Sequence, residues 1–160
     1  MTIEGLRNKI KEELSHAEEL LRNIDGIVYS ATLEETDRTA YMFGVVMIGT
    51  EGMADGDKIY LSLEGEIDIN DVVNEEKLAA DATAFRERVE GICARLAAAE
   101  DKGAEILAIG GEMDRELDER YQAELDRLNA TTKSNLRVAL TAAGVLIAVA
   151  AICILIGVLF

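Results

Sequence analysis

The chain contains no proline, one histidine and two cysteines. Without proline, no residue forces a helix to stop. Helical metal sites need two histidines four residues apart, or a histidine with carboxylates from other segments. His16 stands among glutamates on one helical stretch, so we expect a solvated side chain and no metal or other cofactor. Cys93 and Cys153 lie in segments of such different character that we expect no disulfide, which fits a reducing compartment.

The sequence also lacks motifs for nucleophilic or phosphate chemistry. It has no GxSxG turn, and the glycines at positions 49, 52 and 56 are too widely spaced for a phosphate-binding loop. The acidic side chains between 51 and 71 do not follow the pattern of a calcium loop. We interpret them as a solvated strand face and loop tips: Glu51, Asp55, Asp57, Glu64, Glu66, Asp68 and Asp71. No catalytic residue is predicted, and we expect the protein not to be an enzyme.

Basic side chains are in the minority and unevenly distributed. The net charge is −15. Residues 1–126 carry all 31 acidic side chains, whereas residues 127–160 carry only the basic Arg127, Lys133 and Arg137. An N-terminal part this acidic is repelled by nucleic acid, so we expect no nucleic-acid partner.

The most informative feature that is present is the uncharged segment from Val138 to Phe160. As a helix it would extend about 34 Å, enough to cross the core of a bilayer. We therefore expect one membrane-spanning helix that anchors the protein by its C-terminal end. Lys133 and Arg137 precede this span, and no basic, apolar leader follows Met1, so we expect the N-terminal part on the cytoplasmic side.

Residues 3–24 have apolar side chains at three- and four-residue steps, which predicts an amphipathic helix. Thr2 is the predicted N-cap of this helix, and Asp25-Gly26 is its predicted stop. The polar face is expected to hold Lys9, Glu12, Glu13, Glu19 and Arg22.

The hydrophobic period then changes to two, and segments 27–33, 39–49 and 58–68 are predicted to be strands. Segment 39–49 is apolar on both faces, which is typical of a central strand. Gly65 indicates a bulge or bend. The connections are short, and parallel strands need long crossovers, so the sequence predicts an antiparallel meander.

A helical period returns near Asp71 and continues to about Gly110, and the pair Gly110-Gly111 predicts a break or bend. One stripe of this helix has heptad spacing. We expect the stripe to pack on the sheet, with a seam for a second chain as the alternative. Its residues are Leu78, Ala82, Phe85, Val89, Ile92, Leu96 and Ala99.

These segments predict an α+β fold in three parts. An N-terminal helix, a three-stranded antiparallel meander and a long helix form a cytosolic head (residues 1–105). A helical stalk (106–135) and one C-terminal transmembrane helix (136–160) follow.

Two stripes predict self-association. The first, the stalk stripe, is apolar but too narrow for a globular core. Its residues are Met113, Leu117, Tyr121, Leu125 and Leu128. The second, the anchor stripe, consists of small residues, which let membrane helices approach closely. Its residues are Ala139, Ala143, Ala150 and Gly157.

The expected function is that of a non-enzymatic, tail-anchored, single-pass membrane protein. It would act as an interaction module or oligomeric scaffold at the cytoplasmic membrane face, where confinement raises the effective concentration of a partner. The expected partners are the membrane, further copies of the chain and an unidentified protein. The alternative is a membrane-active effector whose oligomerised anchors permeabilise the bilayer. The uncharged span disfavours this alternative, because water-filled paths are usually lined by ionisable or polar side chains.

Overall fold

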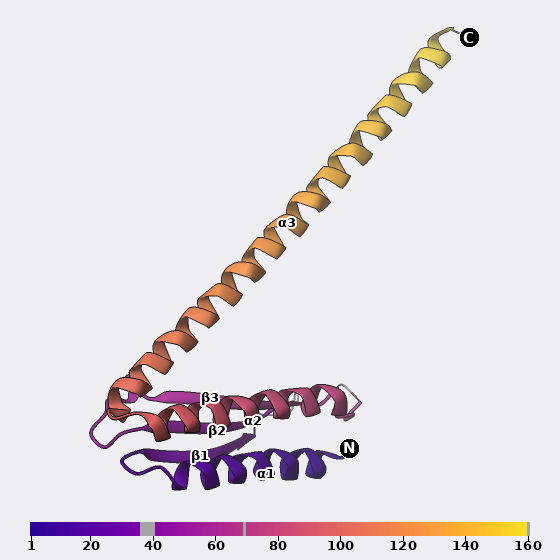
Figure 1. The fold of residues 1–160 in the computed structure, drawn as a ribbon. Helices are drawn as coiled ribbons and strands as arrows, with labels where there is room; N and C mark the ends of the chain where they lie inside the picture. Colours follow the sequence, from indigo (N-terminus) through magenta and orange to yellow (C-terminus); the bar gives the residue numbers. More distant parts are fainter. Residues whose placement is uncertain (36–40, 69, 160) are drawn as a thin grey trace. The chain divides into compact units, whose positions relative to one another are not determined.

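The computed structural model describes residues 1–35, 41–68 and 70–159, except for the side chains of 41 and 133–159 (Figure 1). The chain divides into two compact units, an N-terminal unit (Met1–Met113) and a C-terminal unit (Asp114–Phe160). The fold is α+β, as predicted. The elements in order are α1 (Ile3–Arg22), β1 (Val28–Glu35), β2 (Tyr41–Gly49), the short 3-10 helix η1 (Asp55–Asp57), β3 (Ile59–Glu66), α2 (Glu75–Ala98) and α3 (Lys102–Leu159).

Helix α1 forms where the apolar period predicted it. The Thr2 hydroxyl accepts a hydrogen bond from the backbone N–H of Gly5 at 3.1 Å, which confirms the predicted N-cap. After the helix, Gly26 adopts a positive φ of 80°, a conformation that glycine reaches without a steric penalty. The buried side of α1 holds Leu6, Ile10, Glu13, Leu14, Ala17 and Leu21.

The three strands form one antiparallel sheet in the order β1-β2-β3. This confirms the predicted meander and the central position of β2. Cross-strand partners fix which side chains share a face: Ile48 pairs with Tyr29 and Ile59, whereas Val45 pairs with Thr32 and Ser62. The two sets lie on opposite faces, because successive side chains of a strand alternate.

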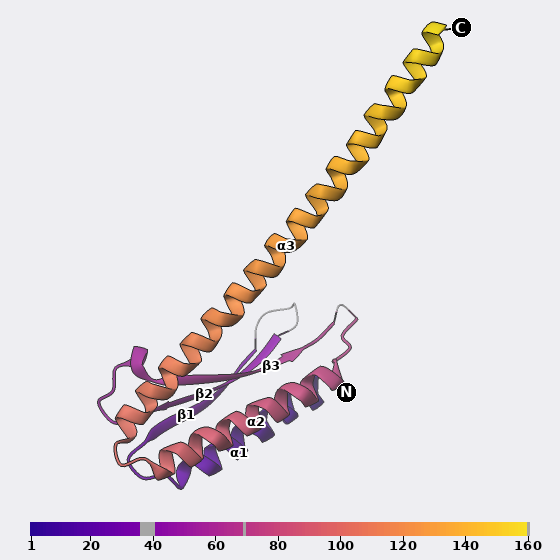
Figure 2. The same cartoon turned by 45° about the horizontal axis from the view of Figure 1, so that its top comes forward.

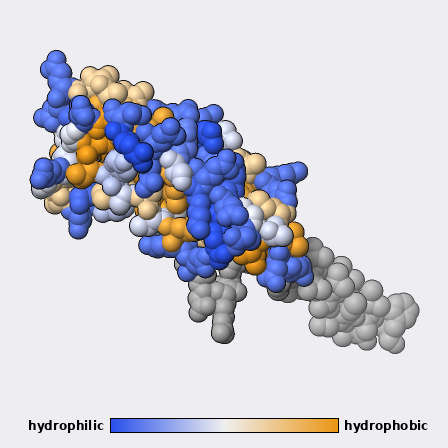
Figure 3. Space-filling model, turned by 90° about the horizontal axis from the view of Figure 1, so that it is seen from below, coloured by the Kyte–Doolittle hydropathy of each residue, from blue (hydrophilic) through white to orange (hydrophobic). Residues whose placement is uncertain are grey.

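Helices α1 and α2 lie side by side on one face of the sheet (Figure 2), which we call the covered face. Helix α1 contacts all three strands, and α2 contacts β3. The core lies between this helix layer and the sheet. The view in Figure 3 is mostly hydrophilic, with hydrophobic residues visible only in small patches. Residues at the centre of the core include Leu6, Ile10, Leu21, Val46, Ile48, Ile59, Leu63, Val89 and Leu96.

Two glycines let α1 approach the sheet closely. A Cβ on Gly44 of β2 would lie 2.8 Å from Cγ2 of Ile10, and a Cβ on Gly65 of β3 would lie 3.0 Å from Cδ1 of Ile10. No bulge forms at Gly65, because Gly65 pairs with Met42 in an uninterrupted ladder. Gly65 instead makes room for Leu6 and Ile10 of the helix above it.

The helical region after the sheet divides at a different place from the one predicted. Helix α2 ends at Ala98, and α3 begins at Lys102 and continues unbroken through Gly110-Gly111. The predicted break at Gly110-Gly111 is therefore wrong. Ile106 and Ile109 are buried in the core, and this packing holds the helix across two residues that cost about 1 kcal/mol each relative to alanine.

The real break has a local cause. Ala99 adopts an extended conformation, with ψ 134°. The side chain of Asp101 then accepts a hydrogen bond from the N–H of Ala104 at 3.0 Å, which caps the start of α3. The heptad stripe of α2 faces the sheet, which favours intradomain packing over a seam for a second chain. Its buried members are Leu78, Ala82, Phe85, Val89, Ile92 and Leu96.

Among the residues with described side chains, none of the helices combines the length and the apolar character needed to cross a membrane. The predicted transmembrane segment, 136–160, lies outside these residues.

Candidate functional site

The sheet has a second face that the helices do not cover. We call it the open sheet face. Its side chains alternate along each strand with those that pack on α1 and α2. It consists of Val28, Ser30, Thr32 and Glu34 of β1, Phe43, Val45 and Met47 of β2, and Tyr60, Ser62 and Glu64 of β3.

Apolar side chains on the open sheet face reach solvent. Val28 is 40% exposed and Tyr60 is 49% exposed. Val45 and Met47 of the central strand are half-buried, and they do not belong to the core cluster. The covered face differs, because Val46 and Ile48 of the same strand are completely buried. Strand β2 is thus apolar on both faces, but the helices cover one of them.

Charge on the open sheet face is concentrated at one end. Phe43 lies in register between Glu34 of β1 and Glu64 of β3, and both carboxylates are exposed. Near the other end, Lys58 forms an ion pair with Asp55 at 2.6 Å. The hydrogen bond from Lys58 lowers the pKa of the Asp55 carboxyl. The cation of Lys58 is therefore already engaged by its own loop.

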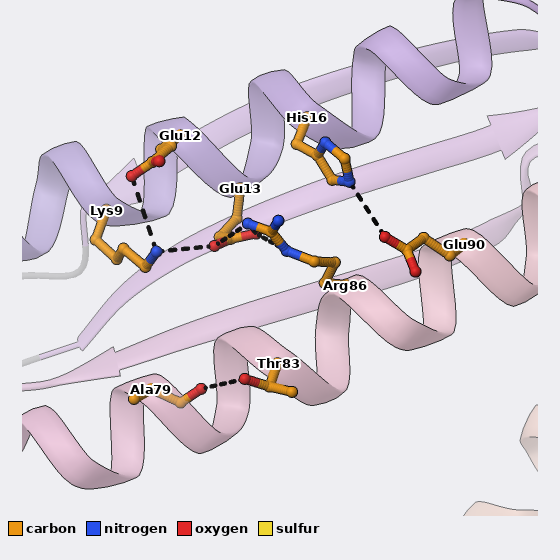
Figure 4. Close-up of polar contacts among 8 residues, drawn as sticks. All are labelled: Lys9, Glu12, Glu13, His16, Ala79, Thr83, Arg86 and Glu90. Atoms are coloured by element: carbon orange, nitrogen blue, oxygen red, sulfur yellow. Dashed lines mark hydrogen bonds and ion pairs between the residues drawn. The ribbon is translucent and has the colours of Figure 1, made fainter.

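A polar cluster around the buried carboxylate of Glu13 joins α1 to α2 (Figure 4). Arg86 of α2 donates to both carboxylate oxygens of Glu13, and the ammonium of Lys9 lies 3.0 Å from the same carboxylate. Burial opposes ionisation of Glu13, but the hydrogen bonds from Arg86 and Lys9 outweigh it and lower the pKa of this carboxyl. The expectation that Glu13 lies on a polar face is wrong, because only 2% of the residue is exposed.

His16 belongs to the same interface between α1 and α2. Its Nε2 atom lies 3.5 Å from Oε1 of Glu90 on α2. This nitrogen is shielded from solvent and has no hydrogen-bond partner in the described part of the chain. The expectation of a solvated histidine holds only in part, because 30% of the side chain is exposed but Nε2 faces the neighbouring helix.

A second polar cluster joins α2 to the first turns of α3. Nε of Arg95 lies 2.7 Å from Glu105, and Nη1 lies 2.6 Å from Glu112. Hydrogen bonds to Glu112 and Glu105 raise the pKa of Arg95. Both clusters connect helices within the N-terminal unit.

The stalk stripe falls in both units. Met113 is half-buried and packs against the core of the N-terminal unit. In the C-terminal unit Leu117, Tyr121 and Leu128 are 66%, 61% and 55% exposed, and Leu125 is half-buried. These side chains form an uncovered apolar strip. The anchor stripe Ala139, Ala143, Ala150 and Gly157 lies outside the residues with described side chains.

The described part of the chain contains a free thiol and a small pocket. Cys93 is buried, and burial raises the pKa of its thiol. No group of three or more His, Cys, Asp or Glu residues within 1–35, 42–68 and 70–132 is arranged to hold a metal ion. A pocket of about 250 Å³ beside the end of β3 is lined by Glu66, Asp68, Val72 and Asn74.

Comparisons of the chain with protein-family models, curated proteins and solved structures find no match.

The sequence pointed only indirectly to the open sheet face. The available signal is the pattern of segment 39–49, which is apolar on both faces and predicts the central position of β2. Which of its two faces would be covered depends on where α1 and α2 pack. That choice is not encoded in the strand itself.

Proposed function

We propose that the protein is a non-enzymatic, membrane-anchored interaction module that offers its open sheet face to a protein partner at the cytoplasmic membrane face. The observation that carries this proposal is the half-covered central strand. A strand that is apolar on both faces is typical of a sheet that is covered on both sides, whereas an antiparallel sheet with one solvated face usually alternates apolar and polar residues. Val45 and Met47 have no helix over them among the described residues. A partner on this face would complete the second layer, and exposed apolar patches commonly mark such sites.

The membrane part of the proposal rests on the sequence. Val138 to Phe160 is free of charge and follows Lys133 and Arg137, which is the pattern of a span with a cytoplasmic basic flank. An anchored module acts without chemistry. It holds its partner near the bilayer and so raises the local concentration of that partner.

Self-association is the second part of the proposal. The exposure of Leu117, Tyr121 and Leu128 supports it, because a stripe of large apolar side chains on a charged helix is stabilised when a second helix covers it. Helices of this kind are consistent with a coiled coil. An oligomer would present several open sheet faces at once, which strengthens binding to a multivalent partner.

The test is proximity labelling from the full chain in its membrane. The variant Val45→Thr/Met47→Gln makes the open sheet face polar and keeps the side-chain sizes similar. Ala84→Thr/Glu87→Gln on the exposed side of α2 is the matched control. We expect labelled neighbours to be lost in the first variant and kept in the second. Equal labelling by both variants would contradict docking on the open sheet face.

A further inference from the structure

The dimensions of the open sheet face indicate the size of its occupant. Its outer strands are about 10 Å apart, and the residues from Val28 to Glu34 extend about 20 Å. The area of this patch is about 200 Å². In a stable protein complex each partner buries about 800 Å², which is four times as much. An α-helix with its side chains is about 10–12 Å wide, and about 14 residues cover 20 Å. The face therefore fits one helix better than a second folded copy.

The covered face shows that this sheet accepts a helix across all its strands. Helix α1 alone contacts β1, β2 and β3. The open sheet face has the same three-strand width and carries Val45 and Met47 at its centre. An amphipathic helix that lays apolar residues at i, i+3, i+4 and i+7 into such a surface is a recurring mode of peptide recognition.

The charges on the open sheet face indicate the sign of the charge that its occupant carries. Glu34 and Glu64 flank Phe43 on both sides, and both carboxylates are exposed. The ammonium of Lys77 forms its ion pair with Glu66 and interacts with Glu64 only at longer range. The whole chain carries −15. A second copy would bring further negative charge to this surface, which is unfavourable. A lysine or arginine near Phe43 would instead lie between two carboxylates.

We propose that the occupant of the open sheet face is a cationic amphipathic helix of about 14 residues, supplied by a partner protein. Its apolar side covers Val45, Met47 and Tyr60, and its basic side chains lie at the end marked by Glu34 and Glu64. This inference rests on the proposed function and adds the shape and charge of the partner.

The experiment selects peptides without prior choice of sequence. The full chain in nanodiscs of zwitterionic lipid is the bait for a displayed library of random 14-residue peptides, counter-selected on empty nanodiscs. We expect selected peptides with a helical apolar period and net positive charge. Their affinity should fall at least about tenfold for Glu34→Lys/Glu64→Lys. Glu76→Lys/Glu87→Lys on exposed α2 changes the net charge equally and should keep the affinity within about threefold.

Each outcome decides between the two proposals. Neutral or acidic peptides, or equal binding to wild type and Glu34→Lys/Glu64→Lys, overturn the cationic helix. If these neutral, acidic or charge-insensitive peptides do not bind Val45→Thr/Met47→Gln, the open sheet face remains a docking surface. In that case only the inference about the charge of the occupant is overturned. No selected peptide at all overturns the inference. An oligomeric state that changes in Val45→Thr/Met47→Gln would identify a second copy as the occupant and also overturn it.

Discussion

Arg86 of α2 holds both carboxylate oxygens of Glu13 of α1, with Nη2 2.8 Å from each oxygen. Replacing the cation in Arg86→Met leaves a buried carboxylate with Lys9 as its remaining partner. Because Arg86 itself is partly exposed, we expect the free energy of unfolding to fall by about 1–3 kcal/mol. Urea denaturation of the full chain in neutral detergent measures this change.

Lys11→Met is the control for this prediction, because it removes a cation from the exposed side of the same helix. It should change stability by about 0.5 kcal/mol or less. Equal losses in the two variants would mean that the pair between Glu13 and Arg86 contributes nothing specific.

The lowered pKa of Glu13 predicts a dependence of stability on pH. Its value in the folded protein is below the ordinary 4.5, so the unfolded chain binds more protons between the two values. The contribution of Glu13 is therefore complete above the ordinary pKa and is lost as pH falls through the lower, folded value. We expect the stability difference between wild type and Glu13→Gln to shrink as pH falls below 4.5. A constant difference would contradict this assignment.

Two glycine substitutions should have opposite signs. The Cβ in Gly44→Ala would lie 2.8 Å from Cγ2 of Ile10 and 2.9 Å from Cδ2 of Leu14, so we expect a loss of about 1–3 kcal/mol. Gly91→Ala, on the exposed side of α2, meets no atom within 4 Å and should gain about 1 kcal/mol from helix propensity. Thermal denaturation measures both, and a gain in Gly44→Ala would show that α1 is not closely packed on β2.

The cap of α3 can be tested at Asp101. Asp101→Ala removes the acceptor for the N–H of Ala104, and we expect a loss of about 1 kcal/mol. Amide hydrogen exchange at residues 102–104 should become faster. Glu100→Ala changes an adjacent exposed acid and should leave exchange at these amides unchanged. Faster exchange in both variants would point to general loss of charge rather than loss of the cap.

Self-association should depend on the stalk and anchor stripes. Leucine at Ala143 and Ala150 would keep membrane helices apart by steric clash, so crosslinking in membranes should fall in Ala143→Leu/Ala150→Leu. It should fall further when Leu117 and Leu125 are also changed to serine. The N-terminal unit is expected to remain folded, which far-ultraviolet circular dichroism checks. Unchanged crosslinking in both variants would favour a monomeric tether.

The helices and strands could be predicted from the sequence better than the burial of individual side chains. Helix α1 and the strands have clear periods, so their type and the order of the sheet could be predicted. The burial of Glu13 could not, because it depends on Arg86, which lies 73 residues further along the chain. A weak signal was present, since Glu13 follows Ile10 by three residues and precedes Ala17 by four, within the apolar stripe.

In the helical region after the sheet, the type of structure was predicted correctly but the position of the break was not. Glycine propensity drew attention to Gly110-Gly111, where core packing of Ile106 and Ile109 overrides it. The capping side chain of Asp101 was a readable start signal for α3 that propensity alone did not reveal. The open sheet face could be inferred only after the positions of α1 and α2 were known.

The start of α3 has a consequence for the order of folding. Nucleating a helix is unfavourable, with a constant on the order of 10⁻³, whereas extending an existing helix is nearly neutral. The Asp101 cap and the buried Ile106 and Ile109 place the nucleus of α3 inside the N-terminal unit. N-terminal units fold first during synthesis. Helix α3 therefore propagates from turns that the packing of the N-terminal unit already holds in place, and its remaining residues avoid the cost of a new nucleus.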